Sequence, residues 1–190
     1  MILSLTGCDL FSTRDPESPD TGKSNYLPPT EPSIVIKNFE YSIKEKNLEN
    51  YLKCFVISGS QGKQIYSFFP SPDAVSSFGS LFENWNVESE RRVFNSVLSQ
   101  LSEGSFPVLY WQNKQPINET PDSAIFVADY YIKFDFNDAN LPKEFAGKIT
   151  LTMIPQDNGL WLIKSWYDYN ATKKDSINNT WSLLKAKFYN

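Results

Sequence analysis

The chain of 190 residues contains no histidine. Imidazole is the commonest metal ligand in proteins and the usual general base of Ser-His-Asp and Cys-His catalytic groups. Metal sites built on imidazole, and nucleophilic triads that depend on it, are therefore excluded. We expect neither a metal site nor a cofactor. The missing histidine removes more classes of enzyme than any motif in the chain adds.

Cysteine is also scarce, because the chain has only two, Cys8 and Cys54. Cys54 lies in the apolar segment 51–55, at the end of a predicted helix, where a small buried side chain is the ordinary interpretation. Cys8 lies near the N-terminus, in a segment that offers another use for its thiol. The pair is therefore not expected to form a disulfide.

Excess positive charge, long apolar runs and phosphate-binding loops are missing as well. The 18 basic and 22 acidic side chains give a net charge of −4, which does not favour binding to nucleic acid. No stretch approaches the ~18 apolar residues that a transmembrane helix needs. The segment 58–62 holds two glycines but lacks the lysine of a phosphate-binding loop. We expect a protein that is anchored or soluble and does not span a membrane.

What the chain does have begins at its N-terminus, where Leu5-Thr6-Gly7-Cys8 closes a short apolar run. This motif resembles a bacterial lipobox. The resemblance implies that a signal peptide is cut before Cys8 and that the Cys8 thiol carries diacylglycerol, a palmitate-bearing membrane anchor. The apolar run is shorter than the ~7–15 residues of a secretory signal, so we interpret residues 1–8 as a signal truncated by a misplaced start codon. The alternative is an ordinary cytosolic N-terminus.

Residues 9–30 and 31–190 differ in composition. The first segment carries four prolines among Asp, Glu, Ser and Thr, at positions 16, 19, 28 and 29. Such a segment buries too little apolar surface to order itself, and it is interpreted as a disordered tether. The remainder is rich in aromatic residues, which make up 15% of the whole chain, and it is long enough for one domain with a real core. Aromatic side chains line cores more often than pockets.

Helices are predicted near both ends of this domain and in its middle. Thr30-Glu31-Pro32-Ser33 offers a cap and a proline for a helix start, and apolar residues follow at four-residue spacing. A second short helix is expected over 48–55. Asn86 is expected to cap a helix over 87–101, in which 88–92 is an exposed charged turn and Glu88 pairs with Arg92. A last amphipathic turn covers 180–188.

The second half of the chain is predicted to be rich in strands, at 108–112, 123–136, 148–154 and 160–169, after one short strand at 64–69. Alternation over 123–136 places Phe126, Tyr130 and Phe134 on an apolar face. Asp129, Tyr131 and Asp135 fall on the opposite face. Gln156-Asp157-Asn158-Gly159 has the composition of a hairpin turn.

The order of these elements, with segments 33–39, 50–55 and Asn158-Gly159-Leu160-Trp161-Leu162-Ile163, resembles the nuclear-transport-factor-2-like (NTF2-like), or cystatin-like, superfamily. The resemblance implies an α+β fold in which N-terminal helices pack on a strongly bent antiparallel sheet. It also implies a cone whose mouth can hold a small apolar ligand, and the candidate pocket residues are Phe126, Tyr130, Phe134 and Trp161. It implies no particular activity.

No acid-base pair is evident from the sequence. Asp129, Tyr131 and Asp135 are expected to be solvated, because they lie opposite the apolar row. Tyr130 is expected to belong to the core. Asp168, near the end of the last strand, is expected to cap a helix or to bind the rim of the sheet, and a role as catalytic acid is the less favoured interpretation.

We therefore expect a lipid-anchored, non-catalytic protein of the bacterial cell envelope, on the periplasmic side or the cell surface. It would attach to the membrane through Cys8 and bind a small apolar ligand or a protein partner. One alternative is a cone-pocket enzyme of the isomerase or dehydratase kind. Another is a scaffold that dimerises through the outer face of the sheet, where Tyr131 and Trp166 could pack.

Overall fold

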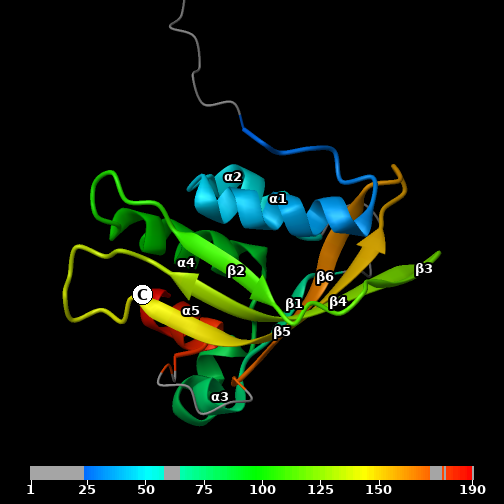
Figure 1. Cartoon of the computed structure of the whole chain (residues 1–190). Coiled ribbons are helices and arrows are strands. Elements are labelled where there is room, and N and C mark those ends of the chain that lie inside the picture. Colours follow the sequence, from blue (N-terminus) through cyan, green and yellow to red (C-terminus); the bar gives the residue numbers. More distant parts are fainter. Residues whose placement is uncertain (1–23, 58–64, 172–176, 178, 190) are drawn as a thin grey trace, which may run out of the picture.

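The computed structural model describes residues 24–57, 65–171, 177 and 179–189, so Cys8 and most of the predicted tether lie outside the described residues. Helices pack on one mixed sheet, in the order β1-β6-β5-β4-β2 with β3 paired to β4 (Figure 1). The α+β class is confirmed. The sheet is antiparallel except for β1, which pairs parallel to β6. The strands are β1 Ser67–Phe69, β2 Val108–Gln112, β3 Asn118–Thr120, β4 Ser123–Lys133, β5 Glu144–Pro155 and β6 Trp161–Tyr169.

The helices are α1 Pro32–Lys44, α2 Leu48–Leu52, α3 Pro72–Phe78, the 3-10 helix η1 Gly79–Phe82, α4 Val87–Ser99 and α5 Trp181–Phe188. Of these, α1, α2, α4 and α5 lie close to their predicted places. Asn86 caps α4 as predicted, because its side chain accepts from the amides of Glu88 and Ser89. The cap predicted at Thr30 is wrong, since Glu31 holds the N-cap position of α1 without a side-chain bond. Within the described residues, no helix is long and apolar enough to cross a bilayer.

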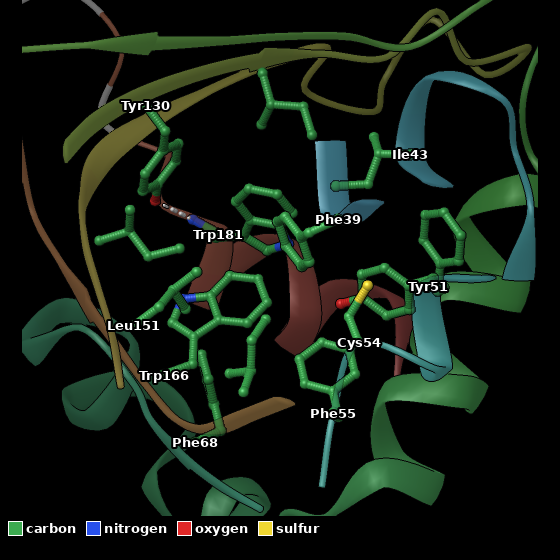
Figure 2. Close-up of a cluster of buried hydrophobic side chains, with 14 of the residues drawn as sticks. Phe39, Ile43, Tyr51, Cys54, Phe55, Phe68, Tyr130, Leu151, Trp166 and Trp181 are labelled. Carbon is green, nitrogen blue, oxygen red and sulfur yellow. Dashed lines mark hydrogen bonds between the residues drawn. The ribbon is translucent and has the colours of Figure 1, made fainter. Parts of the chain in front are cut away.

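Aromatic side chains from the helices and the sheet meet in one core. Phe39 of α1 is fully buried, and its ring centroid lies 5.4 Å from that of Trp166 on β6 and 5.7 Å from that of Trp181 on α5. Trp166 and Trp181 also pack edge to face at 4.8 Å, as Figure 2 shows. The inner face of the sheet is thus covered by both α1 and α5.

A β-bulge in β6 decides which of its side chains face this core. Thr152 pairs with Ser165 and Met153 pairs with Ile163, so Lys164 has no opposite residue on β5. One extra residue reverses the alternation beyond it. Trp166 is consequently 0% exposed and faces the same side as Ile163. The expectation that Trp166 packs on the outer face was wrong for this reason.

Residues 24–30 lie along the helical layer before α1 begins. The Asn38 side chain, itself buried, accepts from the Leu27 amide at 2.9 Å and donates to the Leu27 carbonyl at 2.6 Å. The Pro29 carbonyl accepts from the amide of Trp161 at 2.7 Å. The Asn38 side chain thus bonds both the N–H and the C=O of Leu27. Together with the Pro29–Trp161 bond, this holds the segment against α1 and the start of β6.

Candidate functional site

A buried polar cluster lies between α4 and α5, with Glu90 at its centre. The Glu90 side chain is 0% exposed and accepts hydrogen bonds from the hydroxyls of Tyr51 at 2.8 Å and Tyr66 at 2.6 Å. It also accepts from the indole N–H of Trp85 at 2.8 Å, and the Lys185 ammonium lies 2.5 Å away. A buried carboxylate is stable only when it is paired and bonded in this way.

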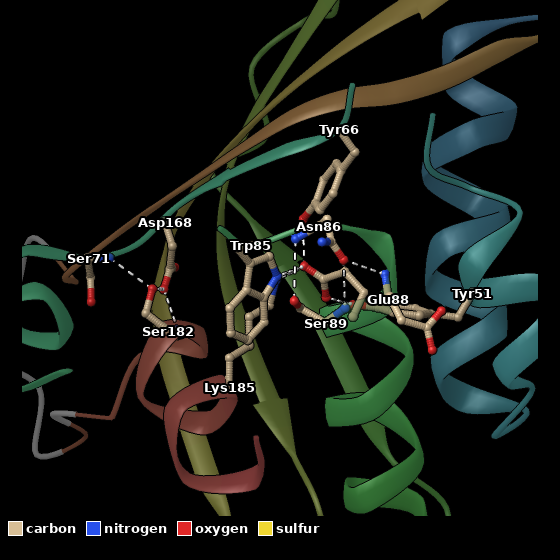
Figure 3. A network of polar contacts seen from close by, with 11 residues as sticks. Tyr51, Tyr66, Ser71, Trp85, Asn86, Glu88, Ser89, Asp168, Ser182 and Lys185 are labelled. Carbon is tan, nitrogen blue, oxygen red and sulfur yellow. Dashed lines mark hydrogen bonds and ion pairs between the residues drawn. The ribbon is translucent and has the colours of Figure 1, made fainter. Parts of the chain in front are cut away.

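Lys185 on α5 reaches this cluster by passing between buried aromatic rings. Its ammonium lies 3.6 Å from the ring centroids of both Phe68 and Trp166, and Figure 3 shows it turned from α5 toward α4. Burial lowers the pKa of Lys185 to about 8, against the opposing effect of Glu90. The rings and the carboxylate together compensate an ammonium that has lost its water.

The first turn of α5 is held by a second polar cluster on the sheet. Tyr130 on β4 accepts from the amide of Trp181 through its hydroxyl at 2.6 Å, and Asp168 on β6 accepts from the amide of Ser182 at 2.6 Å. The Thr180 side chain accepts from the amide of Leu183. The free N–H groups that begin a helix are therefore satisfied by side chains from three different places.

Asp168 makes further bonds within this cluster. Its carboxylate accepts from the Tyr130 hydroxyl at 2.8 Å and from the Ser182 hydroxyl. Burial raises the pKa of Asp168 to about 6, and the bonds from Ser182 and Tyr130 oppose that shift. The predicted role of Asp168 as a helix cap is confirmed. Its raised pKa would also suit a general acid, so the pKa does not distinguish a helix cap from a catalytic acid.

The candidate pocket residues lie in separate neighbourhoods of the core. Phe126 packs edge to face on Trp111 at 5.4 Å, and Phe134 packs on Phe136 and Phe145. The amide of Trp161 binds Pro29, and Tyr130 packs on Trp181 at 5.4 Å. All four are buried, and only Tyr130 is brought into a polar cluster.

The acidic residues expected on the outer face do lie there. Asp129 accepts from the Asn113 side chain at 2.7 Å. Asp135 pairs with Lys143 at 2.6 Å, which lowers the pKa of Asp135. No group of three or more Cys, Asp and Glu side chains among the described residues is placed to hold a metal ion.

Sequence reasoning missed Glu90. The segment 88–92 was expected to be a charged turn with a surface pair between Glu88 and Arg92, and no separate role was expected for Glu90, which is buried. A signal was present, because Glu90 precedes the buried Phe94 by four residues and Val97 by seven, which is the spacing of one helix face. A charged residue on an apolar face indicates a buried pair, but its partner on α5 is 95 residues away.

The predicted Glu88–Arg92 pair is also corrected. Glu88 pairs with Arg91 at 3.3 Å, and Arg91 reaches Glu49 of α2 at 3.1 Å. The Arg92 guanidinium lies 4.8 Å from the ring centroid of Tyr189. Glu88 pairs with the residue three positions on, not four, because Arg91 lies where it can also reach Glu49 on α2.

Two hollows of about 380 Å³ each open at the surface of the described residues, and none of the four candidate pocket residues lines either of them. One lies beside β1, and its lining includes Ser67–Pro70, Phe82 and Trp85. The other lies between the N-terminal segment and the β5–β6 hairpin, with Tyr26 and Leu162 in its lining. Their volumes fall within the range of small ligand sites.

No protein-family model matches the sequence, and no curated protein matches it. Solved structures do match. They include a nuclear-transport-factor-2-like superfamily protein from Salmonella enterica serovar Typhimurium, with a TM-score of 0.56 and 14% identity, covering 74% of this chain and 89% of that protein. A conserved protein from Planctomyces limnophilus gives 0.55 and 9%, covering 72% and 91%. A candidate scytalone dehydratase from Novosphingobium aromaticivorans gives 0.54 and 11%, covering 78% and 89%.

These identities are too low to carry an activity from any of the matched proteins to this chain. The matches are to the fold, and they agree with the order of helices and strands. The described residues therefore have the nuclear-transport-factor-2-like fold, as the sequence predicted.

Proposed function

We propose that this chain is a non-catalytic binding protein whose cone is closed from within by its own C-terminal helix. The observation that carries the proposal is the position of Trp181, whose ring lies within 5.7 Å of the ring centroids of Phe39, Tyr130 and Trp166. These residues line the space that a ligand would occupy in an open cone. The nearby Tyr130 hydroxyl and Asp168 carboxylate bond the first turn of α5. Partners would therefore bind on the outside of the domain.

The alternative, a cone-pocket enzyme of the isomerase or dehydratase kind, is favoured by one observation. Asp168 and Tyr130 are joined by a hydrogen bond of 2.8 Å, and burial raises the pKa of Asp168 to about 6, as in acid-base catalysts. A substrate would have to displace Trp181 to reach that pair. The two functions therefore differ in whether a small apolar molecule can enter the interior.

Indole is a suitable probe for this question, because it matches the ring that fills the cone. We expect no saturable change in the indole N–H signals of Trp181 and Trp166 when wild-type protein is titrated with indole to about 1 mM, roughly the affinity of a weak fragment. The measurement is a ¹⁵N-correlated NMR spectrum, with Trp181→Phe used for assignment. A saturable shift confined to these signals would contradict the closed cone and support the enzyme.

We also propose that Cys8 anchors the protein to the cell envelope, on the periplasmic side or the cell surface. The support is the Leu5-Thr6-Gly7-Cys8 motif and the proline-bearing segment behind it. An acyl chain contributes ~0.8 kcal/mol per buried CH₂, and more than one chain is needed for stable attachment.

The expected result is incorporation of radiolabelled palmitate into the chain when it is expressed in a bacterial host. Cys8→Ser should abolish the label and move the protein from the membrane fraction to the soluble fraction. Cys54→Ser is the matched control, because Cys54 is buried and should keep the label. Equal labelling of wild type and Cys8→Ser would end this proposal.

A further inference from the structure

β1 is an edge strand of the sheet. Among the described residues it pairs with β6 alone, and its three residues Ser67-Phe68-Phe69 hold no charge and no proline. An edge strand leaves backbone N–H and C=O groups unpaired on its outer side. Charged side chains often keep other strands away from such an edge, and β1 has none.

Large apolar side chains are exposed in the segment 65–78, which contains β1 and α3. Ile65 is 57% exposed, Phe69 42%, Val75 49% and Phe78 44%. Phe69 also stacks flat on Tyr167, with ring centroids 4.1 Å apart, so its ring is held in place beside the edge.

A hollow of about 380 Å³ runs along the same edge, and we call it the β1 groove. It is lined by Ser67–Pro70 together with Gly79, Phe82, Glu83 and Trp85. Phe82 and Trp85 are buried and give it an apolar floor. Glu83 is exposed at its rim and forms no salt bridge within the described residues, so the groove carries one uncompensated negative charge.

We propose that the β1 groove binds an extended peptide segment of a protein partner, which adds a strand to the open edge of β1. An apolar side chain of that peptide enters the hollow over Phe82 and Trp85, and a basic side chain two positions later meets Glu83. Residues i and i+2 share one face of a strand, which sets this spacing. Backbone bonds supply affinity in this mode and the side-chain pocket supplies specificity.

This inference rests on the proposed binding function and names its surface and the chemistry of its partner. A compact small ligand would leave the β1 backbone unpaired, whereas an extended peptide uses the edge, the hollow and Glu83 together. Charge complementarity selects a basic peptide over a neutral or acidic one.

The experiment uses fluorescein-labelled hexapeptide mixtures with Thr or Val at the outer positions, Phe, Leu or Ile at the third position and Arg at the fifth. Fluorescence anisotropy with the full chain should give a saturable signal. Glu83→Lys should weaken binding at least tenfold, and exchange of Arg for Glu in the peptide should restore it. Glu119→Lys is the matched control, because Glu119 is an exposed glutamate on β3, beside β4 and away from β1.

A peptide that is N-methylated at alternate residues tests the added strand, because it cannot donate to an edge. It should bind at least tenfold more weakly than the parent peptide. Absence of saturable binding by any mixture would overturn the β1 groove as a peptide site and leave the closed cone unaffected. If neither Glu83→Lys nor N-methylation of the peptide weakens binding, the peptide does not add a strand to β1. That result would overturn the proposed site but leave a protein-binding function in place.

Discussion

Lys185→Met is expected to lower the free energy of unfolding by about 3–5 kcal/mol. The substitution removes the ammonium that lies 2.5 Å from the Glu90 carboxylate, and both side chains are 0% exposed. Tyr51, Tyr66 and Trp85 would still donate to the carboxylate, but its charge would be buried without a counterion. Urea unfolding followed by circular dichroism measures the loss.

The double variant Glu90→Gln with Lys185→Met is the matched control. The glutamine oxygen can still accept from Tyr66 and Trp85, and its amide nitrogen can donate to the Tyr51 hydroxyl oxygen, so no charge is left without a partner. We expect the double variant to recover most of the loss of the single variant, because replacing both members of a buried pair is close to neutral. Additive losses in the double variant would show that the pair is not coupled.

Gly147→Ala is expected to destabilise the fold by about 3 kcal/mol, at the upper end for overpacking. A Cβ at this position of β5 would lie 2.5 Å from the Tyr130 hydroxyl and 2.5 Å from the Tyr169 carbonyl. Gly147 stands directly opposite Tyr130 in the sheet. The added methyl group would push the Tyr130 hydroxyl away from both Asp168 and the Trp181 amide, and so loosen the start of α5.

Gly79→Ala is the control for the intrinsic effect of the substitution. Its Cβ would meet Val75 at an ordinary 3.8 Å, and its φ of −51° suits any residue. We expect no loss, or a gain of roughly 0.4–1 kcal/mol through the unfolded state. Thermal unfolding followed by circular dichroism compares the two variants. Similar melting temperatures for both would contradict the close packing of Gly147 against Tyr130.

The polar clusters give the raised pKa of Asp168 a structural setting that does not depend on catalysis. Asp168 has the burial and the pKa of a catalytic acid, yet its partners are Tyr130 and the first turn of α5. A helix start needs acceptors for its free N–H groups, and a carboxylate interacts well with the positive end of the helix dipole. Tyr130 and Asp168 thus hold the start of α5.

Local patterns predicted the elements well where each pattern is complete within a few residues. The alternation through Phe126, Tyr130 and Phe134 predicted β4 and its inward face. Asn86 predicted the start of α4, because capping acts within one turn. The edges of these elements were less accurate, since helix ends fray and depend on neighbouring contacts.

What the sequence alone determined was the α+β class, the places of the helices and most of the strands, and the inward row of β4. Those features follow from periods and caps that lie within one segment. Only the tertiary structure decided that Trp166 and Asp168 face the core, because the bulge at Lys164 depends on pairing with β5. It also decided that Lys185 meets Glu90, 95 residues away, since no short-range pattern encodes the contact of two helices across a core.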